Sequence, residues 1–148
     1  MSDPLYRKEV LRLAADAHGA GHLDAPHAAG TARNPACGDA VHVELGLDPV
    51  GRIVELAHDT KACVLTQASA SILGRDLKDM TRDDVEALRA RVAAMLRNDG
   101  DAPAPPFDAY AVFDGVAPHR NRHACVLLPI DAVLAALPKS GEDVQGNP

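Results

Sequence analysis

Hydrophobic and polar residues alternate along residues 40–47, where the apolar side chains occupy every second position: Val41, Val43, Leu45 and Leu47. This period of two predicts a half-buried β-strand. The next four residues, Asp48-Pro-Val-Gly51, form a turn signal with proline in its second position. Apolar residues beyond the turn indicate a second strand over 52–58, so the two strands should form a hairpin. A third short strand is expected over 59–62.

Two stretches in the first half of the chain carry apolar residues at helical spacing. The first runs from Asp3 to Ala17, with Asp3 placed as the helix cap and Pro4 in the first turn. The second covers residues 64–73, directly after Cys63, and Gly74 follows it as a stop signal. Cys63 is therefore expected at a helix N-terminus.

Two further helical stretches follow in the second half. Residues 81–99 open with Thr81 and Asp84 in the positions of a capping box, and their apolar side chains form one stripe. Cys125 falls in or just before an amphipathic stretch whose apolar residues are Val126, Leu127, Ile130, Val133 and Leu134. The pattern therefore predicts a mixture of helices and a small sheet.

Loops are expected where glycine, proline and polar residues gather. Residues 18–33 contain three glycines, one proline and three histidines, and residues 99–106 are rich in proline. The polar segment 139–148 is expected to fray. With 148 residues the chain is long enough for one domain over 1–148, with an ordered core at about 4–138.

Charge and composition exclude several classes of function. The net charge is −6 and the sequence pI about 5.5, and no basic cluster is interleaved with aromatic residues, so a nucleic-acid partner is not expected. No apolar run is long enough to span a membrane, and the N-terminus has no signal-peptide pattern, so we expect a cytoplasmic protein without a membrane partner. In a reducing cytoplasm, three cysteines indicate metal or catalytic chemistry more readily than disulfides.

The cysteines and one aspartate are the candidate chemical groups. Cys37 and Asp39 lie in a turn before the alternating strand, and Cys63 and Cys125 lie near predicted helix starts. Three thiolates and one carboxylate are enough for a tetrahedral zinc site or for the protein ligands of an iron–sulfur cluster. The spacing matches no compact zinc-finger pattern, and a free cysteine is also a common buried apolar residue, so packing roles stay open for Cys63 and Cys125.

The local sequences around these cysteines resemble a known family. Asn-Pro-Ala-Cys-Gly-Asp before a strand, then Ala-Cys-Val-Leu-Thr-Gln-Ala-Ser-Ala-Ser, then Arg-His-Ala-Cys, are similar in order and context to the three cysteine motifs of the IscU and NifU N-terminal scaffold proteins. The resemblance runs from about Tyr6 to Leu137. It is nearest to the SufU branch, because Ala124 precedes the last cysteine, Arg122 lies three residues before it, and the segment between the second and third cysteines is long.

This resemblance implies an α+β fold, in which a small three-stranded antiparallel sheet packs against helices. It implies that Cys37, Asp39, Cys63 and Cys125 bind a metal, usually zinc in SufU-like proteins. It also implies that Cys37 accepts persulfide sulfur from a SufS-type cysteine desulfurase and that downstream iron–sulfur assembly proteins or apo acceptors follow. Arg122 is a candidate for stabilising the freed thiolate.

Two alternatives remain beside this hypothesis of a sulfur-transfer partner, which would not be a stand-alone enzyme. The same ligands, including Cys37, Cys63 and Cys125, could assemble and transfer a [2Fe-2S] cluster. A chain of another class could use them only as a structural metal-binding or interaction module. Among nearby residues, His123 is a candidate substitute ligand, and Ala62 replaces a glycine that the family usually has before its second cysteine.

Overall fold

The computed structural model describes residues 7–36, 38–98 and 100–138. Its strands are β1 (Ala28–Asn34), β2 (Asp39–Leu47) and β3 (Ile53–Lys61). Its α-helices are α1 (Lys8–Asp16), α2 (Val64–Asp76), α3 (Arg82–Leu96) and α4 (His123–Ala136), and two 3-10 segments, η2 (Phe107–Val116) and η3 (Arg120–Arg122), precede α4. The expected α+β class is confirmed.

The strands form one antiparallel sheet in the order β1-β2-β3. The predicted hairpin is confirmed: β2 and β3 join through the Asp48–Gly51 turn, which the Gly51 amide closes by donating to the Asp48 carbonyl at 3.0 Å. The separate strand expected over 59–62 is wrong, because β3 continues without a break to Lys61. Asp59, Thr60 and Lys61 are all polar, so the apolar pattern of the strand ends before the strand itself does.

The third strand is β1, which begins inside the segment 18–33 that the sequence pattern predicts as a loop and ends just beyond it at Asn34. Its inward positions are the small residues Ala28, Gly30 and Ala32, and its outward positions are exposed. A helix lies so close to this face that a Cβ on Gly30 would fall 2.7 Å from the carbonyl carbon of Ala135. The face must therefore be small, and a small-residue face lacks the large apolar residues by which alternation is recognised.

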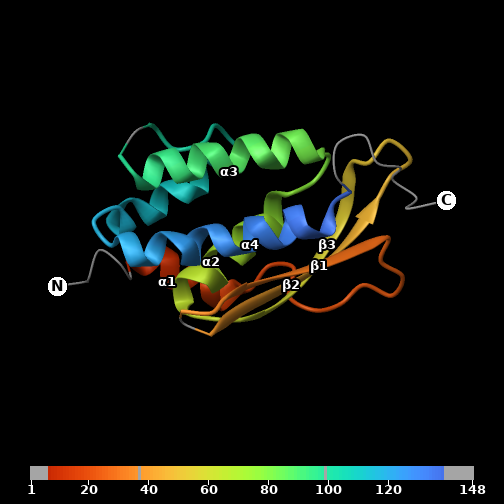
Figure 1. The fold of residues 1–148 in the computed structure, drawn as a ribbon, viewed down its shortest axis with the longest axis horizontal. Coiled ribbons are helices and arrows are strands. Elements are labelled where there is room, and N and C mark those ends of the chain that lie inside the picture. Colours follow the sequence, from red (N-terminus) through yellow and green to blue (C-terminus); the bar gives the residue numbers. More distant parts are fainter. Residues whose placement is uncertain (1–6, 37, 99, 139–148) are drawn as a thin grey trace.

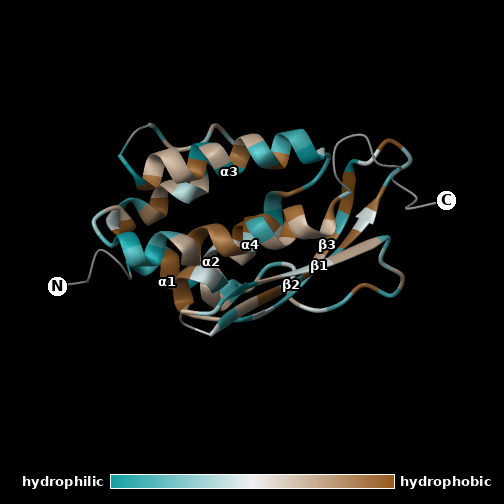
Figure 2. Ribbon diagram, in the orientation of Figure 1, coloured by the Kyte–Doolittle hydropathy of each residue, from teal (hydrophilic) through white to brown (hydrophobic). Residues whose placement is uncertain are grey.

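The helices lie on one face of the sheet in layers (Figure 1). α4 packs on β1 and β2, α2 packs on β3 and against α4, and α3 covers α4 on the side away from the sheet. α4 is apolar almost all round, as Figure 2 shows, because it is enclosed between the sheet, α2 and α3. This enclosure fixes the position of Cys125 in its first turn.

The helix boundaries correct the sequence prediction in two places. Arg7 is extended, so α1 begins at Lys8 and not near Asp3, which lies outside the described residues. α2 does not stop at Gly74 but continues to Asp76. Gly74 is instead the point of closest approach to the 18–19 segment, since a Cβ there would collide with the His18 carbonyl oxygen.

The remaining helix predictions hold. α3 begins with the predicted capping box, in which the Thr81 hydroxyl accepts from the Asp84 amide and the Asp84 carboxylate accepts from the Thr81 amide. Cys63 is the N-cap residue of α2, and Cys125 lies inside α4. The segment after the proline-rich stretch folds as η2 and buries Tyr110 and Phe113 in the core.

Candidate metal centre

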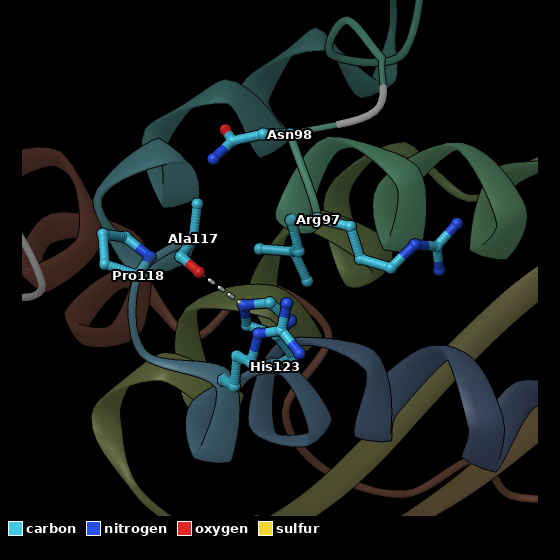
Figure 3. Close-up of a pocket in the computed structure, with 7 residues that line it drawn as sticks. Arg97, Asn98, Ala117, Pro118 and His123 are labelled. Carbon is cyan, nitrogen blue, oxygen red and sulfur yellow. Dashed lines mark hydrogen bonds between the residues drawn. The ribbon is translucent and has the colours of Figure 1, made fainter.

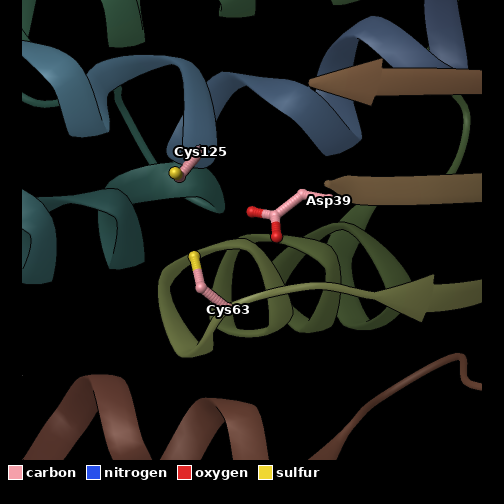
Figure 4. A group of neighbouring side chains, drawn as sticks. All are labelled: Asp39, Cys63 and Cys125. Atoms are coloured by element: carbon pink, nitrogen blue, oxygen red, sulfur yellow. The ribbon is translucent and has the colours of Figure 1, made fainter. Parts of the chain in front are cut away.

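Three of the four predicted ligands meet where β2 begins and where α2 and α4 begin. The Cys63 and Cys125 sulfurs and a carboxylate oxygen of Asp39 all lie within 4.8 Å of one another. Figure 4 shows the three side chains pointing toward a common point from three different elements. Residues far apart in the sequence therefore form one cluster.

Each of these side chains is held by its element. Asp39 is the first residue of β2, paired in register with Asn34 of β1, and is 7% exposed. Cys63 is the N-cap of α2, but its side chain makes no capping hydrogen bond, so the sulfur is not used to complete the helix. Cys125 is 1% exposed in the first turn of α4.

The hydroxyl of Thr66 touches all three of these residues. It donates to the Cys125 carbonyl oxygen at 2.9 Å and lies 3.3 Å from the Asp39 carboxylate and 3.5 Å from the Cys63 sulfur. Thr66 itself is fully buried. Thr66 could not be recognised from the sequence, because a threonine within an alanine- and serine-rich helix has no pattern that separates it from a packing residue.

The fourth predicted ligand, Cys37, lies outside the described residues. It belongs to the loop 35–38 that connects the paired residues Asn34 and Asp39. The described parts of this loop are ordered by Asn34, whose side chain accepts from the Ala36 amide and whose carbonyl accepts from the Gly38 amide. Gly38 has φ +75°, a conformation that favours glycine.

The three described donors fit a metal ion of the zinc type. Zinc binds thiolate at about 2.3 Å and carboxylate oxygen at about 2.1 Å, so tetrahedral ligand atoms lie roughly 3.5–3.8 Å apart. Donor atoms within 4.8 Å of one another need only a small contraction to reach that spacing. Thiolates together with one carboxylate also match the borderline softness of zinc.

Comparison with known proteins places the chain in a family. The model of the NifU-like N-terminal domain matches residues 5–126. The chain belongs to the NifU-like N-terminal domain family. This is a family of iron–sulfur cluster assembly scaffolds, which work with cysteine desulfurases and acceptor proteins. Among curated proteins, none matches this sequence.

Solved structures agree with this membership. The N-terminal part of a nitrogen-fixing NifU-like protein from Brucella abortus is 36% identical, with a TM-score of 0.83 over 89% of this chain and 91% of that one. A putative iron–sulfur cluster assembly scaffold protein of the SUF system from Fervidobacterium islandicum is 20% identical, with a TM-score of 0.81 over 93% of this chain and 100% of that one. The second likeness shows that the folds agree.

Two residues near the last cysteine of this NifU-like chain were also candidates. His123 is turned toward the 3-10 segments, where its Nε2 lies 3.0 Å from the Ala117 carbonyl oxygen. It lines a cavity of about 380 Å³ at the start of α4 together with Leu96, Arg97, Asn98, Ala117, Pro118 and Arg120 (Figure 3). Arg122, the other candidate, is half-buried in η3, and its role stays a prediction.

The departure at Ala62 from the family pattern has no cost in backbone strain. Ala62 does not have a positive φ, so this position does not require glycine. Two buried serines of α2 make hydrogen bonds to other elements: Ser69 donates to the Val126 carbonyl at 2.7 Å, and the Ser71 hydroxyl accepts from the His18 amide at 3.0 Å.

His22, in the segment before β1, and His42 of β2 form a separate group on the far side of β2 from the core. His22 and His42 both lie within hydrogen-bonding distance of the same Glu44 carboxylate oxygen, at 3.1 and 3.3 Å. The Leu23 amide also donates to this carboxylate, and these contacts hold the pKa of Glu44 below its ordinary value. No metal cluster of the described residues includes them.

No helix among the described residues has the length and apolar character needed to cross a membrane.

Proposed function

We propose that this chain is a SufU-like acceptor of persulfide sulfur from a SufS-type cysteine desulfurase. In this proposal Cys37 takes the sulfur, and Cys37, Asp39, Cys63 and Cys125 hold a zinc ion. The observation that carries the proposal is the convergence of two thiols and a carboxylate from three elements.

Chain connectivity supports Cys37 as the fourth ligand. Cys37 is two residues from Asp39, so their Cα atoms are separated by at most about 7 Å. Asn34 and Asp39, the residues on either side of the loop, are paired at the end of the sheet where the cluster forms.

The donor set suits sulfur transfer. Zinc, when bound, would keep the thiolates deprotonated and has no redox chemistry that could oxidise them. If a ligand from the desulfurase replaced Cys37 on the zinc, the freed Cys37 thiolate could attack the terminal sulfur of the desulfurase persulfide. One sulfur–sulfur bond would then form on Cys37, the bond in the desulfurase persulfide would break, and the desulfurase cysteine would leave as a thiolate. Arg122 is the proposed positive charge beside the freed Cys37 thiolate.

A second candidate uses the same ligands as a scaffold on which a [2Fe-2S] cluster is assembled and then transferred. Family membership favours this function, and cysteine thiolates are the usual ligands of such clusters. Here the cluster is cargo, passed on to an apo acceptor.

Metal analysis and desulfurase kinetics separate the two. Protein purified without added metal should contain about one zinc per chain, and iron with acid-labile sulfide would favour the scaffold instead. Adding the protein should raise the cysteine turnover of a SufS-type desulfurase, and Cys37→Ala should abolish the increase. Ala36→Ser, in the same exposed loop, is the matched control and should keep it. Equal turnover with and without the protein would overturn the sulfur-acceptor proposal.

A metal-free protein with slowly reacting thiols would instead indicate a structural or interaction module.

A further inference from the structure

The hydroxyl of Thr66 lies at the centre of the candidate metal centre, although it is not one of its ligands. Thr66 is the third residue of α2 after the N-cap Cys63, so its side chain reaches back over the helix start. From there its oxygen contacts the Cys63 sulfur, the Asp39 carboxylate and the Cys125 carbonyl. One buried atom therefore connects the three elements that supply the ligands.

The contact with Cys125 follows from a proline in α4. The carbonyl of Cys125 would normally accept from the amide four residues later, but that residue is Pro129, which has no N–H. The Thr66 hydroxyl donates to this carbonyl from the neighbouring helix at 2.9 Å. The hydrogen bond ties the first turn of α4, and with it Cys125, to the start of α2.

The same hydroxyl has a second acceptor. It carries a single hydrogen, and the Asp39 carboxylate oxygen at 3.3 Å competes with the Cys125 carbonyl for it. Both acceptors are buried, so the position of the carboxylate depends on this shared donor. A side chain of the same shape without the hydroxyl would remove this hydrogen-bond donor from both the Cys125 carbonyl and the Asp39 carboxylate.

We propose that Thr66 is a positioning residue that sets the spacing of Asp39, Cys63 and Cys125 and so determines how tightly the site holds its metal. This inference rests on the proposed metal site. Groups that hydrogen-bond to metal ligands commonly change metal affinity by about 10- to 100-fold when they are removed.

The test compares three variants with the wild-type protein. Thr66→Val keeps the shape and removes the hydroxyl, and Thr66→Ser keeps the hydroxyl. Ser69→Ala is the matched control, because Ser69 lies on the same helix, is equally buried and also donates to a carbonyl of α4, that of Val126, but contacts none of the ligands. Zinc affinity is measured by competition with a chromophoric chelator, and the visible spectrum of the Co²⁺-substituted protein reports the ligand geometry.

Thr66→Val should weaken zinc binding by about 10- to 100-fold and shift the Co²⁺ spectrum, whereas Thr66→Ser should restore both. Ser69→Ala should leave both unchanged even if its thermal stability falls. Wild-type affinity in Thr66→Val, or an equal loss in Ser69→Ala, would overturn the role of Thr66 while leaving the metal site intact. Failure of the wild-type protein to bind zinc or Co²⁺ would overturn the metal site and this inference together.

Discussion

Gly30 lies where β1 and α4 approach each other closely, and its replacement by alanine should destabilise the fold measurably. A Cβ at this position would lie 2.7 Å from the Ala135 carbonyl carbon and 2.8 Å from the Ala136 Cα, and would also collide with the Ala136 amide nitrogen. All three are backbone atoms of α4. They cannot move by a change of side-chain rotamer, so the helix and the strand must separate.

The magnitude follows from this geometry. Carbon atoms pack best at about 3.5–4.0 Å, so α4 must retreat by roughly 1 Å. Overpacking of this kind costs about 1–3 kcal/mol, and we expect the upper end because the obstacle is backbone. Alanine has less conformational entropy than glycine in the unfolded chain, and this offsets about 0.5–1 kcal/mol of the cost. The net loss of about 2 kcal/mol should lower Tm by about 4–8 °C for a chain of this size.

Thermal unfolding followed by circular dichroism measures this loss, with Gly100→Ala as the matched control. A Cβ on Gly100 would meet its nearest neighbours, Arg91 Nη1 and Ala94 Cβ, at the ordinary distances of 3.5 and 3.6 Å. Gly100→Ala should therefore unfold near the wild-type temperature. Equal Tm values for the two alanine variants would show that α4 is not held against β1 as closely as we infer.

Three further predictions concern the core and the metal. Pro129→Ala restores a backbone amide that can donate to the Cys125 carbonyl. Thr66→Val should therefore lower the free energy of unfolding by about 1 kcal/mol less in the Pro129→Ala protein than in the wild type. A double-mutant cycle measured by urea unfolding tests this, and additive effects of the two substitutions would contradict it. Burial of His58 lowers its pKa, and this effect outweighs the His18 carbonyl and Asp59, which raise it. The buried neutral His58 therefore contributes stability that is fully present above pH 6.5 and is lost as the pH falls toward the lowered pKa. Urea unfolding from pH 7.5 to 5.5 should therefore show a stability loss, of at most about 1.4 kcal/mol per pH unit, that is smaller in His58→Gln. Removing metal with a chelator should lower Tm, and adding zinc back should restore it with a dependence on zinc concentration; a Tm insensitive to zinc would argue against a bound ion.

The elements that the sequence predicted were those whose packing face is large and apolar. β2 could be recognised because Val41, Val43 and Leu45 fill the core at every second position. β1 could not, because the close approach of α4 requires small residues on its inner face. The missed strand is thus a consequence of the tertiary contact, which no local pattern contains.

The candidate site likewise combines features that a local sequence pattern reveals with features that depend on tertiary contacts. Its cysteines and Asp39 were found from local motifs, each of which is complete within a few residues. Their convergence depends on α4 returning beside β1 and β2, and the motifs alone could not give this geometry. The part played by Thr66 could not be predicted either, because it depends on Pro129 in another helix.

α4 is held at both ends by contacts of different kinds, and this separates stability from metal binding. Its last turn rests on Gly30, while its first turn is tied to Thr66, and Cys125 and Ala136 lie about 16 Å apart along the helix. A displacement forced at the Gly30 end is taken up far from the ligands, so Gly30→Ala should lower Tm with little change in zinc affinity. Thr66→Val acts at the ligands themselves and should lower zinc affinity more than its effect on Tm would suggest. If zinc affinity instead fell in proportion to Tm in both variants, it would simply follow the stability of the fold, and Thr66 would have no separate role in placing the ligands.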